Sequence, residues 1–356
     1  ARAGSKVVAA SATAEPLAGL QWDMAQIHAT AGGGSYDVQL GDHGVRVGIL
    51  DSGIDGTHPD IAPNLDLARS CSFIFDHDPA ALDVEKGNGD CSNKAAVQDQ
   101  FGHGTHVASI IAAPINGIGI AGVAPSVKIM AIKFLSSNDA GCGTDAQAIA
   151  AIAYAAAQGA KIINASWGGY GVSPALEAAI AAVPSVLLVA AAGNDNVDND
   201  ISPTYPASYD LPNVLSVANA HHAGFLAGTT NYGLSTVDVA APGTAIWSSI
   251  PAPSGGTAGW MFMHGTSMAA ANASGVAALA TAAKPSLYGN ATGLRNQLIR
   301  TGRPLPAATG WIANARLLDA RAAVVARPDI ARIAGSDRYA SAAAVSAAVY
   351  PSLTQY

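Results

Sequence analysis

His264-Gly-Thr-Ser-Met-Ala-Ala270 places Ser267 between small residues at the head of a long Ala-rich apolar run. Two other stretches complement it. Asp51-Ser-Gly-Ile-Asp-Gly-Thr-His-Pro-Asp60 follows a run of Val, Ile and Leu, and Gly102-His-Gly-Thr-His-Val-Ala108 opens another small-residue stretch. A serine hydroxyl is a poor nucleophile unless a base takes its proton and a third group fixes the tautomer of that base. The three stretches supply these groups as Ser267, His103 and Asp51.

The order of the three groups along the chain discriminates between hydrolase folds. Lipases and esterases run Ser, Asp, His and carry Gly-x-Ser-x-Gly, whereas chymotrypsin-like proteases run His, Asp, Ser. Here Gly265-Thr-Ser-Met-Ala269 lacks the final glycine of the esterase motif, and the order is Asp, His, Ser. From about Gln21 to about Val325 the chain resembles the subtilisin-like serine proteases of the peptidase S8 family. The resemblance implies a secreted serine endopeptidase of broad specificity that acts on peptides or proteins through these three residues.

Apolar runs alternate with Ala-rich stretches from residue 45 onward, a pattern that predicts a parallel sheet with helical crossovers. The predicted strands are 45–50, 127–132, 161–164, 186–190 and 214–217, and the predicted covering helices include 145–158 and 174–182. Thr144 or Asp145 is a suitable cap for the first helix. We therefore expect an α/β protein with the three-layer subtilisin-like fold, a central, mostly parallel sheet and helices on both faces. Active sites of such sheets lie beyond the carboxyl ends of the strands, where Asp51 follows its strand.

Composition limits the classes of partner. Of 356 residues, 50% are apolar and 12% are charged, which fits a buried globular core. A net charge of −7 argues against nucleic-acid binding. No apolar stretch reaches the 18 residues that would indicate a membrane span, and we expect a monomer. Cys71 and Cys91 flank a polar segment, so they are either a disulfide of a secreted protein or two unrelated thiols; Cys142 is then left over.

We expect one peptidase domain over residues 20–327, flanked by two other segments. Residues 1–19 are Ala/Ser-rich and predict an N-terminal tail or the remnant of a removed pro-segment. Within 328–356, the stretch from Arg332 to Ser346 resembles the start of a bacterial cell-wall-binding type 2 repeat, cut off at Tyr356. That resemblance implies a cell-wall polymer as a further partner, although the same stretch also suits a solvated terminal helix.

The family resemblance assigns groups around the nucleophile. Val189-Ala-Ala-Ala-Gly-Asn194 leaves an apolar strand, and in the family this motif carries the oxyanion-hole asparagine, which implies that role for Asn194. Ser166-Trp-Gly-Gly169 and Gly141-Cys-Gly143 match the two segments that pair with substrate backbone, where glycine permits close approach. The implied substrate-binding residues are Gly141, Cys142, Gly143, Ser166, Trp167, Gly168, Ala192, Gly193 and Thr204.

Two pocket positions depart from common family residues. Thr204 lies where relatives often have Gly, which would narrow the floor of the primary pocket, and Asp145 lies near the fourth subsite, where many relatives have an aromatic residue. We therefore expect weak selection for a large apolar residue at the fourth position. Cys142 is either a small buried apolar residue or a thiol whose modification would block the cleft.

Ala113-Pro-Ile-Asn-Gly-Ile-Gly-Ile-Ala-Gly122 resembles the loop that binds a structural calcium ion in many relatives. The implied ligands are all oxygen atoms, as a hard cation prefers. They are the carbonyls of Pro114, Ile118 and Ile120 and the side chains of Asn116, Asp60 and Gln21. The alternative is a glycine-rich turn without an ion.

Beyond the nucleophile the chain departs from its relatives. Most of them read Ser-Met-Ala-x-Pro-His-Val, whereas this chain has Ala271 and Asn272 in place of Pro and His. Alanine sustains a helix without the preset φ of proline, so we expect the site to survive. The rival interpretations are a catalytically inactive protein of this fold that acts as a wall interaction module, and a serine esterase or amidase acting on small molecules.

Overall fold

The computed structural model describes residues 15–78, 81–137, 141–252 and 259–327. The segment 328–356, with its resemblance to a wall-binding repeat, lies outside the described residues, as does most of the segment 1–19. Within the described part no helix is both long and apolar enough to cross a membrane.

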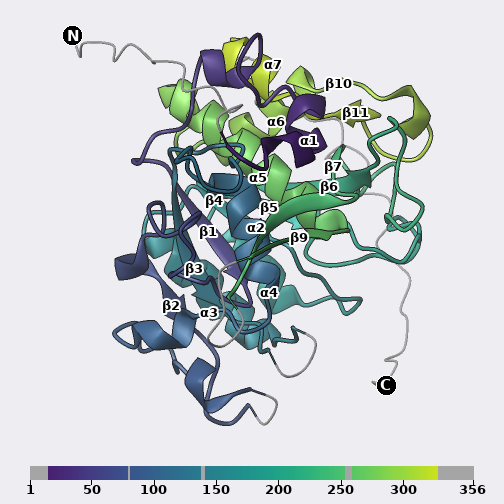
Figure 1. Ribbon diagram of the computed structural model, residues 1–356. Coiled ribbons are helices and arrows are strands. Elements are labelled where there is room, and N and C mark those ends of the chain that lie inside the picture. The colour runs from purple at the N-terminus through teal and green to yellow at the C-terminus, as the bar shows by residue number, and fades with distance from the viewer. Residues whose placement is uncertain (1–14, 79–80, 138–140, 253–258, 328–356) are drawn as a thin grey trace.

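A nine-stranded sheet forms the middle layer (Figure 1), in the order β10-β11-β7-β6-β5-β4-β1-β3-β2. All its strand pairings are parallel except that of β10 with β11. The strands are β1 Arg46–Asp51, β2 Cys71–Ser72, β3 Lys128–Lys133, β4 Ile162–Ala165, β5 Leu187–Ala191, β6 Val214–Ala220, β7 Val239–Pro242, β10 Arg303–Pro304 and β11 Arg316–Leu317. The predicted strands are confirmed to within one to three residues at each end.

Helices cover both faces of the sheet because consecutive strand residues point to opposite sides. Ile49 packs in one apolar cluster with α2 (His103–Ala112) and α5 (Thr266–Ala283). The next residue, Leu50, packs in a second cluster with α3 (Asp145–Ala157) and α4 (Pro174–Ala181). Strands buried on both faces are typical of parallel sheets, and the predicted three-layer α/β class is confirmed.

Smaller elements complete the fold. A two-stranded antiparallel sheet, β8 Ile246–Ile250 with β9 Gly259–Met263, lies beside α2. The remaining helices are α1 Trp22–Gln26, α6 Ala291–Thr301 and α7 Ala320–Val325. Thr144 caps α3, as predicted, by accepting a hydrogen bond from the Gln147 amide.

The departure after the nucleophile leaves the helix intact. Ala271 and Asn272 both lie inside α5 and are fully buried. The amide of Asn272 donates to the carbonyl of Pro242 at 3.1 Å, which anchors the helix to the end of β7. Alanine therefore replaces proline without interrupting the helix.

Cys71 and Cys91 form a disulfide, as one of the two alternatives predicted. The bridge closes a loop that connects β2 with the polar segment before α2. In the chain-entropy model a loop of this length stabilises the folded state by roughly 3 kcal/mol.

Candidate active site

Asp51 and His103 meet at the carboxyl edge of the sheet. Asp51 is the last residue of β1 and is fully buried, whereas His103 is the first residue of α2 and is partly exposed. The Asp51 Oδ1 atom lies 2.8 Å from His103 Nδ1 and also accepts from the Ser52 amide at 2.7 Å. Burial alone would lower the pKa of His103, but the charge and hydrogen bond of Asp51 outweigh it and raise that pKa above 6.5. The contact also fixes the tautomer, so that Nε2 is the free base.

A second carboxylate holds the helix that carries His103. Asp99 accepts from the backbone amides of Phe101 and Gly102 at 3.0 and 2.8 Å. It also accepts from the amide and hydroxyl of Thr105 at 2.9 and 2.6 Å. The Gly102 and Thr105 amides are among the unpaired backbone donors at the start of α2, which an anion at a helix N-terminus satisfies. Sequence reasoning missed Asp99, although an acidic residue four positions before a helical His is a visible capping signal.

Ser267 lies in the first turn of the second helix of the site. It is the second residue of α5, which packs side by side with α2. Its hydroxyl donates to the carbonyl of Ser166 at 3.1 Å, and the Ser166 hydroxyl donates to the carbonyl of Ser267 at 2.8 Å. The structure thus joins Ser267 to Ser166 rather than to His103 by a hydrogen bond. Rotation about the Cα–Cβ bond of Ser267 would redirect its hydroxyl. Hydrogen bonds between a catalytic base and its nucleophile often tighten only when substrate binds.

Asn194 lies beside the nucleophile at the exit of β5. Its Oδ1 accepts from the Thr266 amide at 2.9 Å and from the Thr266 hydroxyl at 3.1 Å. A backbone amide can only donate, so the contact fixes which end of the Asn194 amide faces Thr266. The Nδ2 donor is therefore the end that Thr266 does not use, and no hydrogen bond among the described residues takes it up. Such an oriented donor beside Ser267 suits an oxyanion.

A pocket of about 310 Å³ opens beside Ser267 and Asn194. It is lined by Ser166, Trp167, Gly168, Gly169, Tyr170, Ala191, Gly193, Asn194, Asp195, Thr204, Thr266 and Ser267. Thr204 lines this pocket; it is held by Asn231, and its methyl carbon would lie 2.9 Å from a Cβ at Gly168. Ala192, which was assigned to the pocket, packs in a separate apolar cluster instead; its neighbour Ala191 lines the pocket.

Asp195 is a pocket residue that sequence reasoning missed. It is the carboxylate among the pocket-lining residues, and it accepts a hydrogen bond that raises the pKa of the Tyr170 hydroxyl. Tyr170 is itself well exposed. The pocket therefore combines glycine walls with one negative charge near its mouth.

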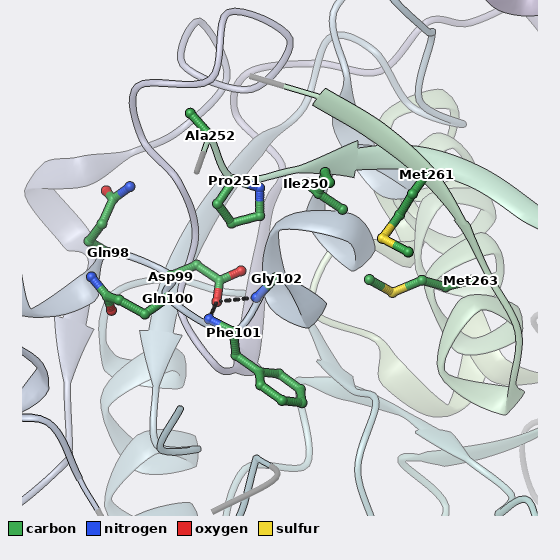
Figure 2. A pocket seen from close by; sticks show the side chains of 10 residues that line it. All are labelled: Gln98, Asp99, Gln100, Phe101, Gly102, Ile250, Pro251, Ala252, Met261 and Met263. Carbon is green, nitrogen blue, oxygen red and sulfur yellow. Dashed lines mark hydrogen bonds between the residues drawn. The ribbon is translucent and has the colours of Figure 1, made fainter. Parts of the chain in front are cut away.

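Two further pockets adjoin the site. One, of about 340 Å³, contains Gly141–Gly143 and Asp145 and shares Trp167–Gly169 with the pocket beside Ser267. The predicted backbone-pairing segments thus line one continuous depression, with Cys142 exposed. The other, of about 390 Å³, lies between the start of α2 and the β8–β9 sheet (Figure 2). Met261 and Met263 line it from the side of β9, and Gln98 and Gln100 line it from the segment before α2.

The predicted cation loop presents oxygen atoms that lack partners. Asp60 is fully buried; its Oδ2 accepts from the Ile120 amide and the Trp260 ring N–H, while its Oδ1 has no partner among the described residues. Burial, with a contribution from the charge of Glu15, raises the pKa of Asp60 to about 7. The carbonyls of Pro114, Ile118 and Ile120 likewise accept no hydrogen bond from the described residues.

The other polar side chains at this loop differ in how many of their oxygen atoms already accept hydrogen bonds. Both polar atoms of the Gln21 amide pair with the backbone of Ala121, at 2.8 and 3.1 Å, which leaves its Oε1 with one further lone pair. Glu15 instead is buried, with Oε1 on the Gly117 amide and Oε2 without a described partner. Asn116 Oδ1 accepts from the Ile118 amide at 2.8 Å. The carboxylate oxygens and carbonyls without partners are the kind of ligand that a hard cation prefers, and Glu15 adds a carboxylate that the sequence analysis did not assign to this loop.

Comparisons with known proteins identify the family and match the fold. The sequence model of the Subtilase family matches residues 42–322. Subtilisin-like protease 2 of Plasmodium falciparum (isolate 3D7) is 35% identical over 67% of this chain, a region that spans only 17% of the relative's own length. Thermitase of Thermoactinomyces vulgaris is 36% identical over 69% of this chain and 77% of its own length. A solved protease structure from Pseudoalteromonas arctica has a TM-score of 0.71 at 27% identity, covering 87% of this chain and 98% of that one.

Proposed function

Because the chain belongs to the Subtilase family, we propose that it is a secreted serine endopeptidase with Asp51, His103 and Ser267 as its catalytic triad. The observation that carries the proposal is the 2.8 Å contact of the buried Asp51 carboxylate with His103, at the start of a helix packed against that of Ser267. Such a carboxylate stabilises the imidazolium that forms when the histidine accepts a proton.

The proposed reaction has two stages, formation of an acyl-enzyme and its hydrolysis, and the same groups act in both. Ser267 Oγ attacks the scissile carbonyl carbon while His103 Nε2 takes the hydroxyl proton. The oxyanion receives hydrogen bonds from Asn194 Nδ2 and from the Ser267 amide at the N-terminus of α5. The C–N bond then breaks as His103 returns the proton to the leaving amine, which leaves an acyl-enzyme. Water, deprotonated by His103, releases the acyl group and restores the hydroxyl.

The substrate we propose is an extended peptide that adds to the glycine-rich segments Gly141–Gly143 and Ser166–Gly168 by strand pairing. Backbone pairing requires little of the side chains, in agreement with broad specificity. Thr204 shortens the primary pocket, and Asp145 in the adjoining pocket disfavours a large apolar fourth residue. If a peptide library shows strong aromatic selection at that position, this part of the proposal is wrong.

We propose that the chain holds a structural calcium ion with Asp60, Glu15, Asn116 and the carbonyls of the 114–120 loop. The ion would neutralise the buried carboxylates, whose mutual repulsion otherwise opposes folding. No group of three His, Cys, Asp or Glu side chains gathers in the described part of the chain, so carbonyl oxygens would complete the shell.

We also propose that the protein is secreted, that it is a monomer and that it attaches to a cell wall. These three proposals rest on the sequence. The wall proposal depends on the stretch from Arg332 to Ser346, and sedimentation of the full chain with purified cell wall, compared with a chain ending at residue 327, tests it directly. Binding that survives the truncation would exclude this stretch as the anchor.

Cleavage of an internal bond separates the endopeptidase from its rivals. The purified chain should cut an unstructured protein at internal peptide bonds, and Ser267→Ala should abolish this cutting. An esterase would hydrolyse small esters but leave the protein intact, whereas an inactive interaction module would do neither.

A further inference from the structure

A fully buried ion pair lies beside the strand that carries Asp51. Lys133 Nζ is 2.6 Å from Glu85 Oε1, and neither side chain has any exposed surface. Lys133 is the last residue of β3 and the register partner of Asp51 in β1. Two charges taken out of water are costly unless other polar groups satisfy them, so the remaining partners of this pair indicate what it holds.

The Lys133 ammonium links the two backbone segments that support the catalytic couple. It donates to the carbonyl of Ser52 at 2.6 Å and to the carbonyl of Gln98 at 3.1 Å. Ser52 directly follows Asp51. Gln98 directly precedes Asp99, the carboxylate at the start of α2 (Figure 2). One ammonium therefore fixes the end of β1 and the approach to α2 relative to each other.

The carboxylate of the pair comes from the disulfide-closed loop. Glu85 lies between Cys71 and Cys91, and it accepts from the Leu82 amide at 3.0 Å and from the Ser137 hydroxyl. Burial would raise the pKa of Glu85, but the hydrogen bonds from Lys133 and Ser137 outweigh burial and lower it. Glu85 is therefore charged at neutral pH and holds the ammonium in place.

We propose that the Glu85–Lys133 pair is a positioning device for the Asp51–His103 couple, anchored by the disulfide-closed loop. The proposal rests on the proposed function for its kinetic consequence but not for its geometry. Without the ammonium, the Ser52 carbonyl loses its partner, and the end of β1 stays held to α2 by the Ser52 hydroxyl, which donates to Asp99 and accepts from the Gly104 amide. We infer that this remaining link alone holds Asp51 and His103 less precisely. Misplacement of a catalytic group by about 1 Å costs on the order of 100-fold in rate.

The test replaces both charges together, so that no lone buried charge remains. Replacement of a buried ion pair by neutral side chains of similar volume is often tolerated, and Glu85→Gln with Lys133→Met is such a double variant. We expect kcat, normalised to titrated active sites, to fall about 10- to 100-fold while KM changes less than threefold. We also expect the downfield NMR resonance of the His103 ring N–H to move or broaden, because its hydrogen bond to Asp51 is loosened.

A second buried ion pair provides the matched control. Arg295 and Asp238 lie 2.5 Å apart, almost fully buried, and neither residue belongs to the site. The double variant Arg295→Met with Asp238→Asn should change the melting temperature but leave both kcat and the His103 resonance as in the parent chain. Should the first double variant not fold, Glu85→Leu with Lys133→Leu, which also leaves no lone buried charge, is compared in the same way.

The two readouts separate failure of this inference from failure of the proposed function. A Glu85→Gln/Lys133→Met variant with kcat within twofold of the parent and an unmoved His103 resonance would overturn the positioning role. A parent chain that cuts no peptide would instead contradict the proposed function, and the resonance alone would then decide the inference.

Discussion

Replacing Asn194 with aspartate removes an amide donor while keeping the acceptor that Thr266 uses. A carboxylate oxygen can still accept the Thr266 amide and hydroxyl, which now bind Asn194 Oδ1 at 2.9 and 3.1 Å. Asn194→Leu, of similar size, removes both functions and leaves the buried Thr266 amide without its partner. The two variants therefore separate oxyanion stabilisation from support of α5.

The expected magnitudes follow from these contacts. Loss of one oxyanion donor costs about 10²–10³ in kcat, or about 2.7–4 kcal/mol, a range that itself derives from a subtilisin. Both variants should show at least this loss, and Asn194→Asp would in addition place a negative charge beside the oxyanion. Only Asn194→Leu should lose stability as well, by about 1–3 kcal/mol for the unpaired buried amide.

Steady-state kinetics on one peptide substrate, normalised to the titrated active-site concentration, measures the first effect. Denaturant unfolding with Ser267→Ala in the background, which prevents self-cleavage, measures the second. A kcat within threefold of the parent in both variants would refute the assignment of Asn194, and equal stability losses would refute its role in holding α5.

Three other measurements address acidity, the charge in the pocket and calcium. Because catalysis needs neutral His103 and Asp51 raises its pKa above 6.5, kcat/KM should fall on acidification with a midpoint above 6.5; Asp51→Asn should move that midpoint down, and a pH profile of both proteins shows whether it does. Asp195→Asn should lower kcat/KM for substrates with Lys at the cleaved bond relative to Leu by a few-fold, measured with paired peptides, since an exposed ion pair contributes about 1 kcal/mol or less; an unchanged ratio would remove Asp195 from the pocket's specificity. Chelation of calcium should lower the melting temperature, because an ion bound only by the folded state stabilises it; Glu15→Gln should abolish most of this shift and Gln21→Ala should not, so the reverse result would restore Gln21 as the ligand.

The sheet could be predicted because its strands are buried on both faces. Runs such as that ending in Ile49 and Leu50 are apolar without alternation, and helices of Ala-rich sequence separate them, which together indicate parallel strands. The β8–β9 sheet was missed because Trp247-Ser-Ser mixes polar and aromatic residues without a clear period. The short edge strands β2, β10 and β11 have too few residues for any pattern to appear.

Site residues could be predicted where a short sequence motif contains the reactive group. They could not be predicted where two residues far apart in the sequence come into contact only in the folded protein. Asp51, His103 and Ser267 each lie in a recognisable stretch, but Glu15 lies in an Ala-rich segment that was interpreted as a tail. Ala192 directly follows β5 and packs in an apolar cluster, whereas its neighbour Ala191 lines the pocket, a difference of one residue that the motif alone does not resolve. Glu85 and Lys133 are separated by a loop and a helix, so only the folded chain shows that they pair.

Active-site titration with a fluorophosphonate tests the central claim, that Ser267 is an activated nucleophile. We expect stoichiometric labelling of the parent chain, with the label found on Ser267 by peptide mass spectrometry and absent from Ser267→Ala. Labelling should slow by orders of magnitude in His103→Ala, because the hydroxyl then has no base. A folded, calcium-loaded chain that takes up no label would contradict the account and leave the inactive interaction module as the better description.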